Sequence, residues 1–154
     1  MSVRPLTVAD IKTLSEKLAA LPLMQRYRRS ATALASDWER AAGQGDSLLV
    51  FEEGGAPIGI AWFQVRGTLG LGGYLRLLAV SAEGQGRQVG RRLLEAYEET
   101  VARASRHTFL LVSDFNREAQ RFYEKHGYRQ VGRLPEAVLP GVDELIYWKC
   151  LHHQ

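Results

Sequence analysis

The chain has 154 residues, of which 45% are hydrophobic and 24% charged, with a formal net charge of +3. This length and balance favour one globular domain spanning residues 1–154. No apolar run is long enough to cross a bilayer, and we find no basic and apolar signal segment at the N-terminus. The single cysteine, Cys150, excludes an internal disulfide, so we expect a cytoplasmic protein with no membrane partner.

The pattern of basic residues and histidines argues against two classes of partner. Arginines are spread over positions 26–29, 87–92, 103–106 and 117–121. A nucleic-acid-binding protein usually gathers its basic residues on one face or helix, so we expect no nucleic acid as a partner. We also expect no metal, because neighbours at metal-ligand spacing are missing around His107, His126, His152 and His153.

The first half of the chain predicts two helices and three strands. Apolar residues recur at three- and four-residue spacing after Thr7 and again after Ser30, and both of these residues can cap a helix. Two glycines between alternating runs indicate a hairpin. In chain order we expect a strand at 3–4, a helix from Thr7 that Pro22 stops, a helix from about Ser30 to Gly43, and strands at 47–52 and 58–65.

The second half predicts a strand–helix–strand unit, which implies a parallel pair with a right-handed crossover. Asn116 and Gly127 are placed to cap and to end a short helix. The architecture is therefore α/β, with a mixed sheet and helices on both faces. In chain order we expect a strand at 74–80, a glycine-rich turn, a helix from about 89 to 101, a strand at 108–112, a helix from Asn116 to Gly127, and strands at 128–132 and 144–151.

The glycine-rich turn from Ser81 to Gly90 is the most informative stretch of the chain. A helix N-terminus offers unpaired N–H groups and the positive end of a dipole. Small residues beside it let a ligand approach the backbone closely. The turn therefore indicates a cradle for a pyrophosphate group. An ordinary strand-to-helix turn is the alternative.

Two motifs, taken with the order of elements, resemble one family over essentially the whole chain. Residues Gln85 to Gly90 match a pattern of Gln or Arg, two residues, Gly, one residue, and Gly or Ala. Gln88 departs from it, because the family usually has glycine there. Residues Asn116 to Tyr128 match Asn-x-x-Ala-x-x-Phe-Tyr-x-x-x-Gly-Phe/Tyr. The chain resembles the GCN5-related N-acetyltransferases (GNAT).

The resemblance implies a mostly antiparallel central sheet with one splayed parallel pair and helices on both faces. It implies transfer of an acetyl group from acetyl-CoA, the cosubstrate, to a primary amine by direct attack within a ternary complex. The acceptor, a small molecule or a protein, stays open, and a homodimer formed through the sheet edge would match many relatives. A non-catalytic acyl-CoA-binding or sensor module on the same fold is the alternative.

The resemblance also assigns cofactor-binding positions to the strand end, the turn and the short helix. Backbone groups of the strand would pair with the pantetheine arm, and amides of the turn would meet the diphosphate. Gln88 must then point its side chain away from the diphosphate. The matching positions are Leu78, Ala79, Val80, Gln85, Gly86, Arg87, Gln88, Val89, Gly90, Arg91, Asn116 and Tyr123.

Tyr123 is the expected general acid. The ordinary pKa of tyrosine is about 10, so the side chain stays protonated at neutral pH and can donate to a departing thiolate. A core aromatic is the alternative for this residue. The general base stays open between Glu83, Asp143, Glu144, a water chain and an amine that enters neutral.

The acceptor side is expected to involve residues from two regions. Tyr27, Arg28 and Arg29 fall in a loop that lines the acceptor cleft of the family, where arginines can select a carboxylate-bearing amine. Tyr74 and Arg76 stand where some relatives carry a glutamate. Solvated surface charge is the alternative for the arginines.

Overall fold

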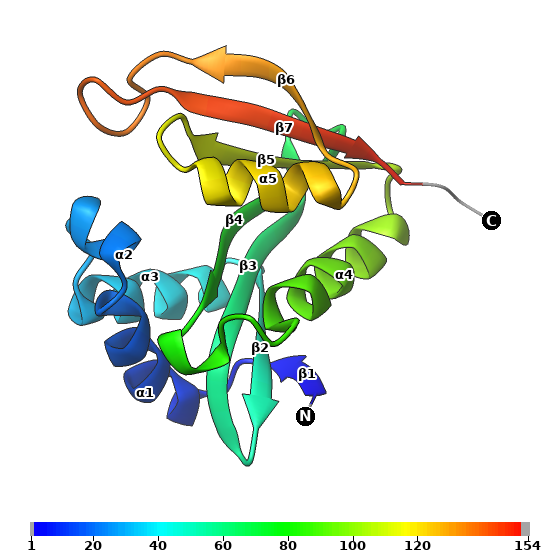
Figure 1. Cartoon of the computed structure of the whole chain (residues 1–154). Helices are drawn as coiled ribbons and strands as arrows, with labels where there is room; N and C mark the ends of the chain where they lie inside the picture. The colour runs from blue at the N-terminus through cyan, green and yellow to red at the C-terminus, as the bar shows by residue number, and fades with distance from the viewer. Residues whose placement is uncertain (1, 152–154) are drawn as a thin grey trace.

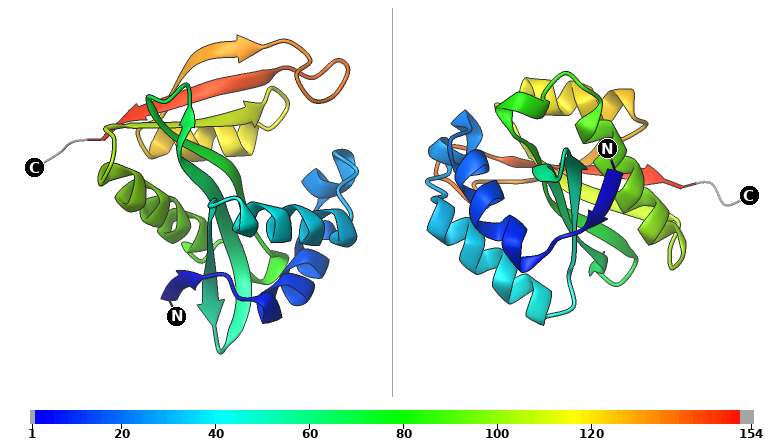
Figure 2. Two further views of the ribbon diagram at one scale, coloured as in Figure 1. Left: turned by 180° about the vertical axis from the view of Figure 1, so that it is seen from behind. Right: turned by 90° about the horizontal axis from the view of Figure 1, so that it is seen from below.

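A seven-stranded sheet forms the centre of the computed structural model, which describes residues 2–151 (Figure 1). Its strands lie in the order β1-β2-β3-β4-β5-β7-β6, and every neighbouring pair is antiparallel except β4 and β5. Helices cover both faces (Figure 2). The expected mixed, mostly antiparallel sheet with one parallel pair is confirmed.

The N-terminal half follows the expected order with one additional helix. Pro22, expected only to stop the first helix, is itself the first residue of a short helix, where its missing N–H is no loss. The apolar spacing after Thr7 also predicts Leu21 as part of the first helix, but Leu21 lies beyond the end of that helix, at the N-cap position of the short one. The elements are β1 Ser2–Pro5, α1 Val8–Ala19, α2 Pro22–Arg26, α3 Ala31–Gly43, β2 Ser47–Glu53 and β3 Ala56–Thr68.

Every element expected in the C-terminal half is present, with ends that differ by a few residues. Asn116 caps its helix as expected, and the chain leaves that helix through Gly127, whose φ is +93°. A single 3-10 turn, η1, opens the glycine-rich segment. The elements are β4 Gly72–Val80, η1 Ala82–Gly84, α4 Val89–Ala102, β5 His107–Ser113, α5 Arg117–Lys125, β6 Arg129–Leu134 and β7 Glu144–Cys150.

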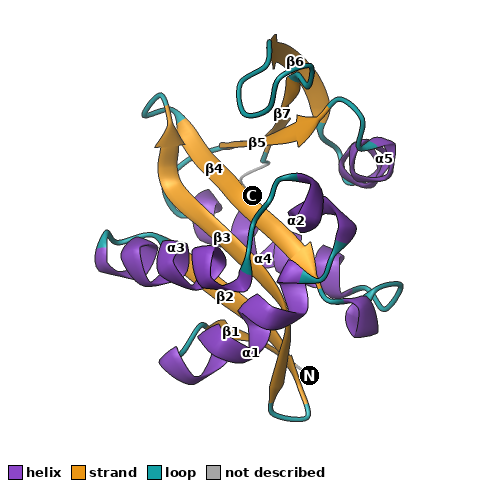
Figure 3. Ribbon diagram, turned by 90° about the vertical axis from the view of Figure 1, so that its left-hand side faces the viewer, coloured by secondary structure: helices purple, strands orange, loops and turns teal. Residues whose placement is uncertain are grey.

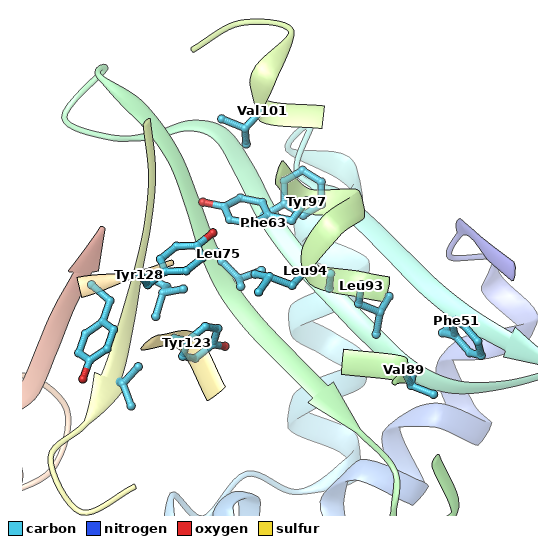
Figure 4. Close-up of a cluster of buried hydrophobic side chains, with 14 of the residues drawn as sticks. Phe51, Phe63, Leu75, Val89, Leu93, Leu94, Tyr97, Val101, Tyr123 and Tyr128 are labelled. Atoms are coloured by element: carbon cyan, nitrogen blue, oxygen red, sulfur yellow. The ribbon is translucent and has the colours of Figure 1, made fainter. Parts of the chain in front are cut away.

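Two hydrophobic cores lie on opposite faces of the sheet. The first lies against α1 and α3 and includes the fully buried Trp38. The second lies against α4 and α5 and includes Phe63, Tyr97 and Tyr123 (Figure 4). Successive residues of β3 alternate between the cores, as strand geometry requires, so that Trp62 packs in the first and Phe63 in the second.

β4 interrupts this alternation at Arg76. Phe63 of β3 pairs with Leu75, but Trp62 pairs with Leu77, so Arg76 has no partner in β3 and forms a bulge. Leu75 and Leu77, which two-residue spacing would put on one face, consequently pack in opposite cores. The bulge resets the strand, so that the residues after it alternate again in the opposite sense.

The two strands of the parallel pair separate at the same place. Among the described residues they pair only over Gly73–Leu75 and Thr108–Leu110, after which β4 continues to Val80 with no strand partner on its β5 side. Figure 3 shows β3 and β4 turning away from the group formed by β5, β7 and β6. Backbone N–H and C=O groups on that side of β4 therefore lack ladder partners.

A partly buried ion pair holds α1 against the first strand. The guanidinium of Arg4 donates to both carboxylate oxygens of Asp10, at 2.7 and 2.9 Å, and the N–H of Thr7 donates to the same carboxylate at 2.8 Å. Asp10 is the third residue of α1, so this arrangement also satisfies the helix N-terminus. The hydrogen bonds from Arg4 lower the pKa of Asp10 to about 2, against the effect of burial.

Asp10→Asn is expected to lower the free energy of unfolding by about 2 kcal/mol at pH 7. A carboxyl whose pKa is lower in the folded state stabilises the protein above its unfolded pKa, near 4. This contribution is lost as the pH falls towards 2. Urea unfolding of both proteins at pH 7 and at pH 3 tests this, with the exposed Glu39→Gln on α3 as a control that should change little. An Asp10→Asn deficit as large at pH 3 as at pH 7 would contradict the ion-pair account.

Candidate active site

A cleft follows the gap between β4 and β5 and continues over the start of α4. It consists of three adjoining cavities that share lining residues. The central cavity, of about 560 Å³, lies between the end of β4 and α5. The turn cavity, of about 610 Å³, lies over the glycine-rich turn. The tyrosine cavity, of about 450 Å³, lies beside the other end of the gap and is named for Tyr27, Tyr74 and Tyr123.

Mostly apolar side chains line the central cavity. Leu78 and Val80 of β4 lie along one side, and Ala119 and Tyr123 of α5 lie along the other. Asn116 also lines it while its side-chain oxygen accepts a hydrogen bond from the N–H of Ala119 at 3.1 Å, so the residue caps α5 as well. Next to the unpaired side of β4, these residues form a slot for an extended chain that can hydrogen-bond to a strand.

The turn cavity lies at the N-terminus of α4. The N–H of Arg92 donates to the C=O of Gln88 at 3.1 Å, so the N–H groups of residues 89–91 have no acceptor within the helix. Gly86 and Gln88 both have left-handed backbones, with φ of +76° and +66°, and the exposed Gln88 makes no side-chain cap. Unpaired N–H groups and the helix dipole suit this end of the cleft to an anion.

Charged side chains around the turn cavity are mixed. Arg91 and Lys125 line it together with one carboxylate, Glu118. Arg87, an expected diphosphate contact, does not line it and is ion-paired with Glu53. Arg91 is also ion-paired, with Glu95 at 2.9 Å, so attraction of an anion rests on the helix terminus and Lys125, with a smaller share from Arg91.

A buried carboxylate lies in the tyrosine cavity. Glu144, the first residue of β7, is 6% exposed. The hydroxyl of Tyr27 donates to its Oε2 at 2.7 Å and is also hydrogen-bonded to Ser113 at the end of β5. Burial raises the pKa of Tyr27 to about 12, so it is a neutral partner for this carboxylate at physiological pH.

The other two carboxylates considered as bases are engaged elsewhere. Glu83 pairs with Lys17 at 2.6 Å, and Asp143 pairs with Arg133 at 2.6 Å. Each basic partner lowers the pKa of its carboxyl. Neither carboxylate lines the tyrosine cavity, where Glu144 is the one acidic residue among the described residues.

Tyr123 lies where the central and tyrosine cavities meet and lines both. It is 8% exposed, and its ring packs edge-on against Phe122 and Tyr128. Its hydroxyl makes no hydrogen bond to any residue in the described range 2–151. Burial raises the pKa of Tyr123 above the ordinary value, so the phenol keeps its proton through the neutral range.

The structure brings most of the expected positions together. Every expected cofactor position lines the cleft except Ala79, which packs in the core against α1 and α3, and Arg87. Every expected acceptor position lines the tyrosine cavity except Arg28, which is exposed outside it. Arg26 and Phe115 were not singled out from the sequence, yet they line the central cavity with the guanidinium 3.5 Å from the ring centroid.

A family model described as an acetyltransferase (GNAT) domain matches residues 44–130. The chain belongs to this family. The matched segment runs from just before β2 to the start of β6 and so contains β4, the glycine-rich turn and α5. The expected family membership is thereby confirmed. No protein with a curated description matches the chain.

Solved GNAT structures share the fold over the whole chain. Ard1 from Thermoplasma volcanium is 21% identical, with a TM-score of 0.81, and the match covers 99% of this chain and 98% of that one. An aminoglycoside 6'-acetyltransferase type Ii is 22% identical, with a TM-score of 0.81 and coverage of 100% and 99%. An aminoglycoside 6'-N-acetyltransferase complexed with coenzyme A is 18% identical, with a TM-score of 0.78 and coverage of 100% and 99%.

The described residues contain neither a membrane-spanning helix nor a metal-binding cluster. Between residues 2 and 151, no helix has the length and apolarity needed to cross a bilayer. In the same range, no three His, Cys, Asp or Glu side chains gather into a group able to hold a metal ion. His152 and His153 lie outside the described residues.

The left-handed backbone at Gln88 explains why this GNAT position favours glycine. A side chain in this conformation costs roughly 1–2 kcal/mol, and glycine avoids that cost. Part of the gain is lost because glycine makes the unfolded chain more flexible. Gln88→Gly is therefore expected to be more stable than Gln88→Ala by about 1 kcal/mol in urea unfolding.

Gln85 is the matched control for this comparison, because its φ of −67° suits any residue. There, Gln85→Gly should be less stable than Gln85→Ala by about 0.5–1 kcal/mol. The same order of glycine and alanine at both positions would contradict a strained Gln88.

Proposed function

We propose that the chain is an acetyl-CoA-dependent N-acetyltransferase that acts on a primary amine by direct attack in a ternary complex. The observation that carries this proposal is the position of Tyr123, which lines both the central cavity and the tyrosine cavity. One cavity continues to the helix N-terminus, and the other ends at a buried carboxylate. Such a cleft has room for a cofactor from one side and an amine from the other.

The residues of the cleft fit the chemical parts of acetyl-CoA. The side of β4 that β5 leaves unpaired, at Leu78 and Val80, suits the pantetheine arm, whose amides can continue the strand ladder. The Gln85 side chain, which donates to the C=O of Val80 at 3.3 Å, would give up this hydrogen bond to the arm. The N-terminus of α4, with Arg91 and Lys125, suits the diphosphate. When bound, acetyl-CoA supplies an activated acetyl group on a thiol leaving group.

Tyr123 is suited to the general acid. Its raised pKa keeps a proton on the hydroxyl at neutral pH, and the absence of a hydrogen-bond acceptor among the described residues leaves that proton available for the leaving sulfur. Glu144 is suited to take a proton from the attacking nitrogen. An acceptor that enters as an ammonium first releases one proton to water through Glu144. On attack the nitrogen loses a second proton to Glu144, and the sulfur gains one from Tyr123. Exchange with water restores both residues.

Direct attack is favoured over a covalent enzyme intermediate by the residues available. Cys150 lies at the end of β7 and lines none of the three cavities. Ser113 lines the tyrosine cavity, but it is hydrogen-bonded to Tyr27 and has no neighbouring histidine in that lining to activate it.

The first experiment combines two measurements on the purified protein. Calorimetry with acetyl-CoA tests binding, and release of free CoA thiol tests turnover over a broad panel of amines. Binding with amine-dependent release is expected. Binding without release from any amine would instead favour the acyl-CoA-binding module, and absence of binding would contradict the cofactor assignment.

Tyr123→Phe is expected to lower kcat by about 10²- to 10⁴-fold, the usual contribution of a positioned acid. The affinity for acetyl-CoA should change little, because the ring remains. Thiol-release kinetics and calorimetry measure the two effects. Tyr147→Phe is the matched control, since its hydroxyl donates to Glu124 at 2.9 Å away from the cleft. Undiminished turnover in Tyr123→Phe would remove this residue as the acid.

A further inference from the structure

Glu144 is a buried carboxylate without a cationic partner. In residues 2–151 no basic side chain forms an ion pair with it, and its side chain accepts a hydrogen bond from the neutral hydroxyl of Tyr27. Burying a charge is costly unless an opposite charge or several hydrogen bonds compensate it. Because Glu144 lines a cavity, a ligand can supply the missing cation.

Arg76, a cation without an anionic partner in the described residues, lines the same cavity. Its guanidinium lies over the ring of Trp62, 4.6 Å from the centroid, and in the described part of the chain it pairs with no carboxylate. Trp62 is itself held by a hydrogen bond from its indole N–H to Asp46 at 2.8 Å. The bulge and this aromatic platform therefore position a cation that has an open side for an anion.

Arg76 and Glu144 place opposite charges in the lining of the same tyrosine cavity. Arg76 comes from β4 and Glu144 from β7, and both influence Tyr74, whose side chain lines the cavity as well. Burial raises the pKa of Tyr74, Glu144 raises it further and Arg76 lowers it. Arg29, in the same lining, makes the cavity more basic than acidic, although Asp37 neutralises part of that charge.

We propose that the acceptor is an amine that carries a carboxylate on a short spacer, with its ammonium at Glu144 and its carboxylate at Arg76. The inference rests on the proposed N-acetyltransferase function and names the substrate class for it. One acidic and two basic residues argue against a polycationic acceptor, because a second ammonium would face Arg76 and Arg29. The same chemistry occurs in free amino acids and at a peptide N-terminus followed by an acidic residue.

The test compares acceptors of equal length that differ only at the far end. 4-Aminobutyrate, butylamine and 1,4-diaminobutane present a carboxylate, a methyl group and a second ammonium, and 6-aminohexanoate with hexylamine repeats the comparison at a longer spacing. Thiol release gives kcat/KM for each. At the better spacing the amino carboxylate should exceed its alkylamine by roughly tenfold to a hundredfold, the usual effect of a charged hydrogen bond.

Two peptides distinguish the sources of the carboxylate. Ala-Asp-Ala and Ala-Asn-Ala, both amidated at the C-terminus, differ only in the acidic side chain. Preference for the aspartyl peptide over every free amino carboxylate identifies a peptide N-terminus as the source, and the reverse order identifies a free amino acid. Equal kcat/KM within every matched set would overturn the inference while leaving the transferase function intact.

Variants at Arg76 connect the preference to the structure. Arg76→Gln should reduce the ratio of amino carboxylate to alkylamine towards one, mainly through KM, and Arg76→Glu should reverse it in favour of the diamine. Arg66→Gln, on the exposed part of β3 outside the cavity, should keep the wild-type ratio. A wild-type ratio in Arg76→Gln would exclude Arg76 as the anion partner.

The outcome also separates this inference from the function on which it rests. Thiol release without discrimination at the far end contradicts only the inference. Acetyl-CoA binding without release from any amine or peptide contradicts the transferase function, and the inference with it. Because Arg76 is exposed at the strand surface, circular dichroism should show each variant folded.

Discussion

The separation of β4 from β5 beyond Leu75 is the constraint on which the rest of the structure depends. A regular parallel pair would exchange hydrogen bonds to the end of both strands, and no space would remain between them. Here the pairing stops after Leu110, and the part of β4 that follows borders a cavity. An unmade backbone hydrogen bond in a dry interior costs about 1–3 kcal/mol, so these groups need water or a ligand beside them. The fold thus leaves backbone groups of β4 that a strand-like ligand can hydrogen-bond.

The extra residue at the bulge, Arg76, lies where the strands separate and determines which way the following side chains of β4 point. Because Arg76 is inserted, Leu78 and Val80 face the second core and the central cavity, while Ala79 faces α1 and α3. The same insertion leaves the Arg76 side chain outside both cores, over Trp62. Bulges are frequent beside active sites because they redirect a side chain without unfolding the strand. A single irregularity therefore shapes the cofactor slot and the acceptor side together.

Much of this arrangement could be predicted from the sequence, because most helices and the glycine-rich turn have clear local sequence patterns. Apolar periodicity predicted α1, α3 and α4, and two motifs indicated the turn and α5, including the cap at Asn116. The bulge at Arg76 left no mark in the sequence, since Leu75 to Val80 reads as one continuous strand. α2 was missed because five residues are too few to show a period.

Residues that depend on distant contacts were the least predictable part of the site. Glu144 was predicted only as one of several candidate bases. What distinguishes it in the structure is a hydrogen bond from the hydroxyl of Tyr27, which is also bonded to Ser113, and both residues are far from Glu144 in the chain. Arg28 was expected beside the acceptor, but its backbone is left-handed and its side chain is exposed outside the cavity. Its neighbours Arg26 and Arg29 line the cleft instead. Loops of this kind are positioned by tertiary contacts that no local pattern encodes.

The short parallel pairing has a mechanical consequence. Within residues 2–151, the strand ladder joins the two halves of the sheet only where Gly73–Leu75 meets Thr108–Leu110. Farther along the cleft, the halves are held by side chains, among them the Tyr27 hydroxyl, which bridges from the end of α2 to β5 and β7. Side-chain packing yields more readily than a strand ladder. The distance between the two halves of the sheet can therefore change more easily than distances within each half, with Leu75 as the pivot. A molecule bound in the gap restrains this motion.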